Sequence, residues 1–160
     1  MAESVAIAGS SLGYRVARYW LPVLAMLALM YWLSTDDFSG ENTRGIIATI
    51  LSRLGYDPEG RFLLAINYIV RKCAHFTEYA VLAALLLRAY RADSPDRWRW
   101  KWALYSLAVV VAWAILDEWH QTFTHTRGGS IWDSLLDASG GSFSLTIIGL
   151  FSLTRRRRLR

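Results

Sequence analysis

Four long, predominantly apolar segments limit the folds open to this chain more than any other feature of its sequence. An α-helix needs about 20 mostly apolar residues to cross the hydrocarbon core of a bilayer. Within lipid, a helix is one of only two structures that satisfy every backbone polar group. We therefore predict an all-α integral membrane bundle of four transmembrane helices. The predicted spans are about 16–34, 62–90, 102–123 and 131–153, within a single domain over 1–160.

The composition agrees with a small membrane protein in contact with lipids. Hydrophobic residues make up 54% of the chain, and eight Trp and eight Tyr are available for aromatic belts at two membrane interfaces. The single cysteine, Cys73, excludes an intrachain disulfide. Much of the net charge of +5 lies in the run Arg155–Arg158 beside an apolar segment. Such a run is typical of a topology signal, so we expect no nucleic-acid partner.

The distribution of Lys and Arg predicts the orientation. Basic residues crowd the N-terminal flank, the loop 92–101 and the tail 154–160. The loop 34–61 is mixed and rich in acids, and the turn 124–130 carries one Arg. Because short cytoplasmic loops carry the excess of Lys and Arg, both termini are predicted to be cytoplasmic.

The first outer loop contains a helix of a different kind. Five apolar residues recur at helical spacing over residues 43–54, whereas Arg44, Ser52 and Arg53 lie off that face. This pattern predicts an amphipathic helix at the membrane interface or against the other helices.

Unusual polar residues recur near the outer ends of three predicted spans. Because ionisable groups at membrane depth are costly, they mark a functional site by default. The predicted acid–base or binding cluster consists of His75, Glu78, Asp117, Glu118 and His120. The predicted ligand-binding residues are Lys72, Gln121, Arg127, Asp133 and Asp137. We expect His75 or Glu78 to lie within side-chain reach of Asp117, Glu118 or His120, with Arg127 or Lys72 toward water.

Small residues continue the stripe that carries the two aspartates of the last span. Asp133 and Asp137 lie one turn apart, and the stripe runs on into Gly140 and Gly141. These glycines are expected to let another helix approach closely.

Two blocks of sequence resemble the VanZ-like family of membrane proteins. RKCAHFTEYAVLAALL (71–86) is similar to the family pattern K-x-x-H-F-x-E-Y-x-x-L. DEWHQTFTHTRGGSIWDSLLDASGG (117–141) is similar to D-E-x-H-Q followed by R-x-x-x-x-x-D-x-x-x-D-x-x-G, and Ser34 matches a serine usual after the first span. The resemblance implies a multi-pass protein of the bacterial cytoplasmic membrane, in a family whose namesake is linked to resistance to the glycopeptide teicoplanin. It names no reaction.

Each of these residues also has a purely structural interpretation. His75 with Glu78 would fasten helices as a buried pair, and Arg127 would anchor to lipid headgroups. Asp133 and Asp137 would form salt bridges to Lys72 or to the adjacent Arg71. Histidines and carboxylates would also suit zinc, but no recognised metal-binding spacing is present. We expect neither a metal nor a cofactor.

Four functions remain open from the sequence. The first is an outer-leaflet site that binds a lipid-linked cell-wall precursor or a glycopeptide. The second is a membrane-embedded hydrolase or transferase for a lipid-linked phosphate or sugar, which uses His75 or His120 as the acid or base. A structural helix bundle and a proton-coupled transporter are the other two.

Overall fold

The chain folds into helices throughout the part that the computed structural model describes, which is residues 12–35, 40–56, 60–96, 98–123 and 130–157. Those residues form five α-helices and no strand, which confirms the all-α prediction. The helices are α1 (Leu12–Leu33), α2 (Gly40–Arg53), α3 (Gly60–Arg91), α4 (Trp100–Gln121) and α5 (Ile131–Arg157).

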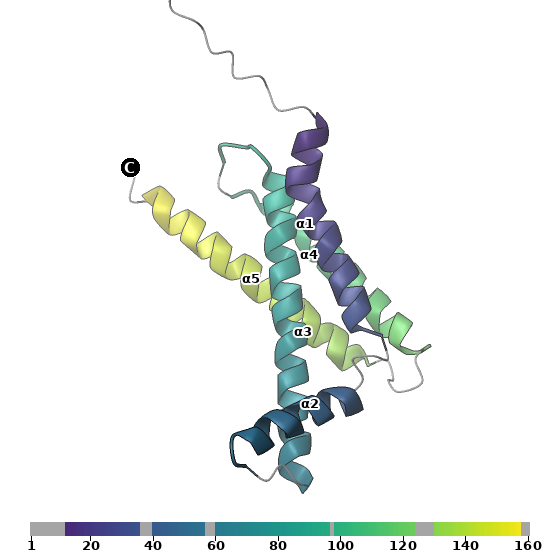
Figure 1. Cartoon of the computed structure of the whole chain (residues 1–160). Coiled ribbons are helices and arrows are strands. Elements are labelled where there is room, and N and C mark those ends of the chain that lie inside the picture. Colours follow the sequence, from purple (N-terminus) through teal and green to yellow (C-terminus); the bar gives the residue numbers. More distant parts are fainter. Residues whose placement is uncertain (1–11, 36–39, 57–59, 97, 124–129, 158–160) are drawn as a thin grey trace, which may run out of the picture.

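Helix α3 is the centre of the bundle, because it packs against each of the other four helices (Figure 1). The start of α1, the end of α3, the start of α4 and the end of α5 lie at one end of the molecule. The opposite ends of these helices lie together with α2 at the other end. The four long helices therefore alternate in direction, as the predicted order of spans requires.

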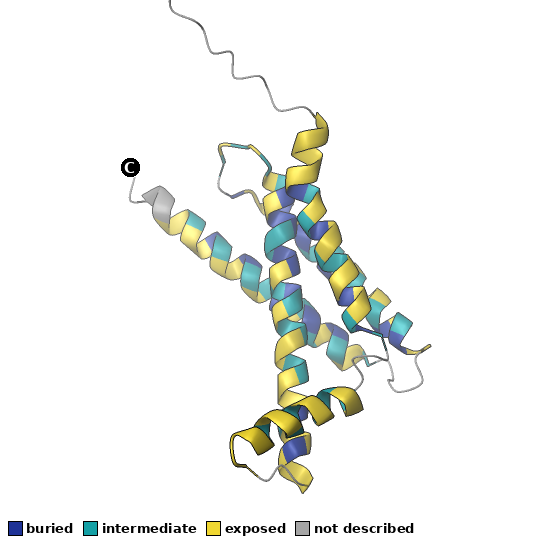
Figure 2. Cartoon of the chain, in the orientation of Figure 1, coloured by how far each residue is buried: buried dark blue, intermediate teal, exposed yellow. Residues whose placement is uncertain are grey.

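Among the described residues, three helices are long and apolar enough to cross a membrane: α1, α4 and the Ile131–Thr154 part of α5. Many of their large apolar side chains are exposed, among them Leu24, Leu104 and Phe151. Figure 2 shows exposed positions along the outward faces of the helices and buried positions on the faces turned toward one another. An apolar surface of this kind is costly in water and suited to lipid, so the chain has the character of a membrane protein.

Helix α3 is not among these three spans, although it is 32 residues long. Its middle carries Arg71, Lys72, His75 and Glu78, which lower its hydropathy. Its second half is apolar and well packed, with Leu82 fully buried. The structure thus shows three apolar spans around a fourth, more polar helix.

Helix α2 corresponds to the predicted amphipathic segment 43–54, but it begins three residues earlier and ends one residue earlier. It has no buried residue, and Ile46 and Ile50 on its apolar stripe are exposed. Its described contact with the bundle includes a hydrogen bond of 3.0 Å from the Asn67 side chain of α3 to the carbonyl of Gly40. The helix therefore lies across the end of the bundle rather than within it (Figure 1).

At the basic end of the bundle, where α1 begins and α3 ends, charged residues pair with one another. Asp93, in the loop after α3, forms a salt bridge of 2.8 Å with Arg15 of α1 and accepts a hydrogen bond from Tyr19. The Tyr19 hydrogen bond, together with Arg15 and Arg18, holds the pKa of Asp93 below its ordinary value. Arg88 of α3 lies 5.3 Å from the centre of the Tyr19 ring.

Candidate functional site

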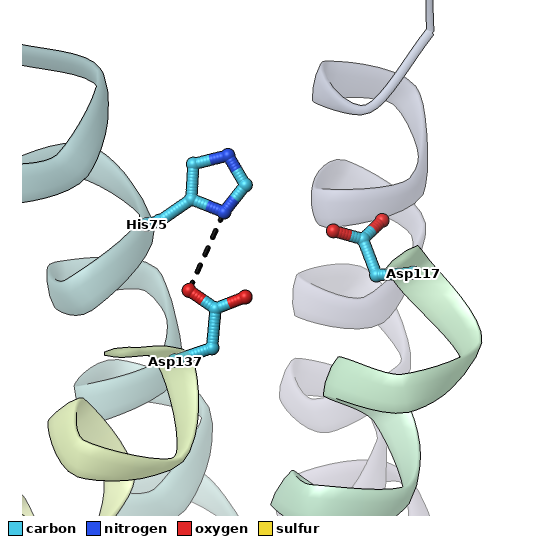
Figure 3. A group of neighbouring side chains, drawn as sticks. All are labelled: His75, Asp117 and Asp137. Atoms are coloured by element: carbon cyan, nitrogen blue, oxygen red, sulfur yellow. Dashed lines mark ion pairs between the residues drawn. The ribbon is translucent and has the colours of Figure 1, made fainter. Parts of the chain in front are cut away.

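Three helices bring one ionisable side chain each to a single point near the end where α2 lies. His75 comes from α3, Asp117 from α4 and Asp137 from α5 (Figure 3). One ring nitrogen of the histidine and one oxygen of each carboxylate all lie within 4.8 Å of one another. The expected juxtaposition of His75 with Asp117 is therefore confirmed, whereas the role of the cluster stays a prediction.

Asp137 is the most deeply buried member, with 0% of its surface exposed. Its oxygen lies 3.4 Å from Nδ1 of His75, which is longer than an ordinary N–H···O hydrogen bond. Neither carboxylate oxygen has a hydrogen-bond partner among the described residues. Because burying an unsatisfied polar group costs about 1–3 kcal/mol, Leu would suit this position better for stability alone. The chain therefore keeps a carboxyl group here at the expense of its own stability.

The close approach of α5 to α3 explains how Asp137 reaches His75. A Cβ atom on Gly140 would lie 2.3 Å from the carbonyl oxygen of Phe76, so only glycine fits between the two backbones. A Cβ on Gly141 would lie 2.7 Å from Cγ1 of Val110 in α4. The predicted close packing at these glycines is confirmed. These glycines let α5 pack closely against both α3 and α4, one turn beyond Asp137.

Gln121 forms a hydrogen bond to Asp117, the third member of the trio, and links it to the end of α1. Its Nε2 donates to Oδ2 of Asp117 at 3.0 Å and lies within 3.3 Å of the Oγ of Ser34. Gln121 and Ser34 are both buried, with 6% and 3% of their surfaces exposed. The serine that follows the first span thus contributes to the placement of Asp117.

Glu118 and His120 are on the same helix but outside this trio. The backbone N–H of Ser130 donates to Oε2 of Glu118 at 2.6 Å, which joins the end of α4 to the start of α5. A carboxylate at this place also interacts favourably with the positive end of the α5 dipole. His120 packs against the ring of Tyr31 in α1, with 4.9 Å between ring centres. The geometry gives both residues roles in joining helices.

Lys72 and Asp133, one turn from the trio, pair with each other. Nζ of Lys72 lies 2.5 Å from an oxygen of Asp133, so α3 and α5 are bridged one turn from the pair of His75 and Asp137. This is the salt bridge that the structural interpretation expected for Asp133. Arg127 lies outside the described residues.

A pocket of about 170 Å³ opens beside the trio. His75 and Asp117 line it together with Glu78, Arg71, Ser34 and Thr43, so α1, α2, α3 and α4 all contribute. Sequence analysis assigned no site role to Arg71. A signal was available, because Arg71 precedes His75 by four residues and therefore shares its helical face.

A sequence profile of the VanZ/LLP1 family matches residues 19–152, which is most of the chain. The chain belongs to the VanZ/LLP1 family. The matched region spans His75, Asp117, Asp137 and the glycines that position them. Comparison with curated proteins and with solved structures returned no match.

Proposed function

We propose that this VanZ/LLP1 protein crosses the bacterial cytoplasmic membrane four times and binds the anionic head group of a lipid-linked cell-wall precursor in the outer leaflet. The observation that carries the proposal is the pocket beside His75 and Asp117, to which Arg71 also contributes. It combines a guanidinium group, which is suited to phosphate, with several hydrogen-bonding side chains at the end of an apolar bundle.

The length of α3 supports its place as the fourth span. From Lys72 to Arg91 it has enough residues to cover the hydrocarbon core at 1.5 Å per residue, which is about 30 Å. The residues before Lys72 then project beyond the core, where they meet α2. In this arrangement Lys72 and Asp133 lie at the outer interface, and His75 and Asp137 lie about one turn below it. The basic loops at the other end favour cytoplasmic termini.

The size of the pocket favours a head group over a whole antibiotic. Sites for drug-sized ligands enclose about 300–1,000 Å³, whereas this pocket encloses about 170 Å³. A glycopeptide such as teicoplanin is larger than a drug-sized ligand. Any resistance to teicoplanin would therefore act through the cell-wall precursor that such antibiotics depend on.

A second candidate function is hydrolysis or transfer at the same lipid-linked phosphate. The observation that favours it is the pair of His75 and Asp137, in which a buried carboxylate would orient an imidazole for acid–base work. Glu78 or Asp117 in the pocket would supply a second group.

One experiment tests binding and catalysis together. Purified protein in lipid nanodiscs is titrated with a short-chain prenyl pyrophosphate, with the uncharged prenol of equal length as the reference. We expect saturable binding of the pyrophosphate that weakens by about 10- to 100-fold in Arg71→Gln, because loss of a charge-assisted contact removes about 1.5–3 kcal/mol. Arg44→Gln on exposed α2 is the matched control. Equal binding of both compounds would refute the proposal, and release of inorganic phosphate would identify the enzyme.

A further inference from the structure

The trio of His75, Asp117 and Asp137 has the composition of a metal site. We propose that these three side chains bind one divalent transition-metal ion of the zinc type. The inference goes beyond the proposed function and does not depend on it, because the ion would bind whether or not a lipid does.

The first argument is charge. Two carboxylates face one imidazole, and both oxygens of the fully buried Asp137 lack a hydrogen-bond partner among the described residues. The nearby cation Lys72 is engaged with Asp133, one turn away. Burying charge without a partner is costly, so buried carboxylates are normally paired or bind metal. A divalent ion would neutralise both carboxylates and give one Asp137 oxygen a partner.

The second argument is the spacing of the donors. Nδ1 of His75 and Oδ1 of Asp137 are 3.4 Å apart, too far for a good hydrogen bond. Two ligands of a tetrahedral ion with bonds of about 2.0–2.1 Å are themselves separated by about 3.3–3.4 Å. The pair therefore already has the separation that a tetrahedral ion requires. Asp117, within 4.8 Å of the other donors, completes the set with a small side-chain movement.

The third argument is the support around the ligands. Metal-binding side chains are usually oriented by outer hydrogen bonds, and Gln121 provides one to Asp117 at 3.0 Å. Gly140 fixes the distance between α3 and α5, and with it the distance from His75 to Asp137. The ligands thus come from three rigid helices rather than from loops.

The donor set and the pocket suggest what the ion would do. An imidazole with two carboxylates suits zinc better than magnesium or calcium, which prefer oxygen ligands alone. Three protein ligands leave the fourth position of a tetrahedral ion open, as in catalytic zinc sites. Because His75 and Asp117 also line the pocket, that position would face it. An ion there would also allow a phosphate to approach Asp117 and Glu78 without repulsion.

The test uses tag-free, full-length protein in nanodiscs, stripped with a chelator and titrated with ZnCl₂ against a zinc-binding dye. We expect about one zinc ion per chain, as in a mononuclear site, and a rise in the unfolding temperature with zinc concentration. Asp137→Asn, Asp117→Asn and His75→Gln are each expected to weaken zinc binding by more than about 100-fold, beyond the usual effect of outer-shell changes. Mg²⁺ serves as the comparison ion.

Two exposed acids serve as matched controls. Glu41→Gln removes an exposed carboxylate that pairs with Arg44 on α2, and Asp93→Asn removes one at the basic end. Both are expected to bind zinc as the unaltered chain does. The proposal is overturned if the unaltered chain shows no saturable zinc binding, a result that needs no variant to fold. It is also overturned if the folded trio variants bind zinc as tightly as the controls, which would assign the ion to surface acids.

Discussion

The two ends of the bundle differ in how their carboxylates are exposed and paired. At the basic end, Asp93 is half-exposed and meets both Arg15 and Tyr19. At the other end, Asp137 is fully buried, and among the described residues His75 alone lies at ion-pair distance from it. Surface ion pairs of the first kind contribute about 0–1 kcal/mol, whereas an unsatisfied buried group of the second kind costs stability. The pairing at the basic end fastens the helices, whereas the burial of Asp137 gives no such gain in stability and fits the site proposed above.

Replacement of Asp137 by leucine gives the largest expected contrast between the two ends. In the presence of a chelator, we expect Asp137→Leu to raise the free energy of unfolding by about 1–3 kcal/mol, because it removes a buried polar group that lacks a hydrogen-bond partner among the described residues. Zinc and ligand binding should be lost in the same variant. Chemical unfolding in detergent measures the first effect, and the dye titration measures the second.

The comparison variant is Asp93→Leu, which removes an acid that is paired at the basic end. It is expected to lower the free energy of unfolding and to leave zinc binding unchanged. A loss of about 3–5 kcal/mol in Asp137→Leu would instead mean that Asp137 is a structural partner of a protonated His75, and the contrast between the ends would fail.

The close contact of α5 with α3 allows a second test of the difference between the two ends, because it sets the geometry around the trio. In Gly140→Ala the added Cβ would meet the Phe76 carbonyl oxygen at 2.3 Å, and backbone cannot rotate away as a side chain can. We expect a loss near the upper end of the usual 1–3 kcal/mol for overpacking, together with weaker zinc binding. Gly45→Ala is the control, since nothing lies within 4 Å of its Cβ. Equal unfolding temperatures for the two variants would contradict the packing argument.

Much of the fold could be predicted from the sequence because hydrophobic length and basic loops act locally. The alternating helices, the separate amphipathic helix α2 and the glycine contact all follow from local patterns. The structure of α3 was harder to predict, because charged residues in its middle have partners on other helices. Lys72 meets Asp133 from a segment about 60 residues away, and no local pattern encodes that pairing.

The sequence predicted where the candidate site lies, but not which of its residues come together. Asp117 and Glu118 are neighbours in the chain, and both were predicted to act together with His75. Consecutive residues point about 100° apart on a helix, so the rotation of α4 decides which one faces the centre. That rotation depends on tertiary packing such as the contact of Gly141 with Val110. Asp117 joins the trio as a result, and Glu118 turns to the backbone of Ser130.

The smallest expected effect concerns the pH dependence of the basic end. The pKa of Asp93 lies below its ordinary value of 3.8 because Tyr19 and the nearby arginines favour the charged form. A carboxyl whose pKa is lowered by folding stabilises the protein fully above its unfolded pKa, and that contribution is lost as the pH falls through the lowered folded value. Asp93→Asn, which can still accept the Tyr19 hydrogen bond, should therefore unfold at a slightly lower temperature than the unaltered chain at pH 7. The gap should close as the pH falls below 3.8. Thermal unfolding across this pH range measures it, and a gap that persists at the lowest pH would show that Asp93 acts through its shape rather than its charge.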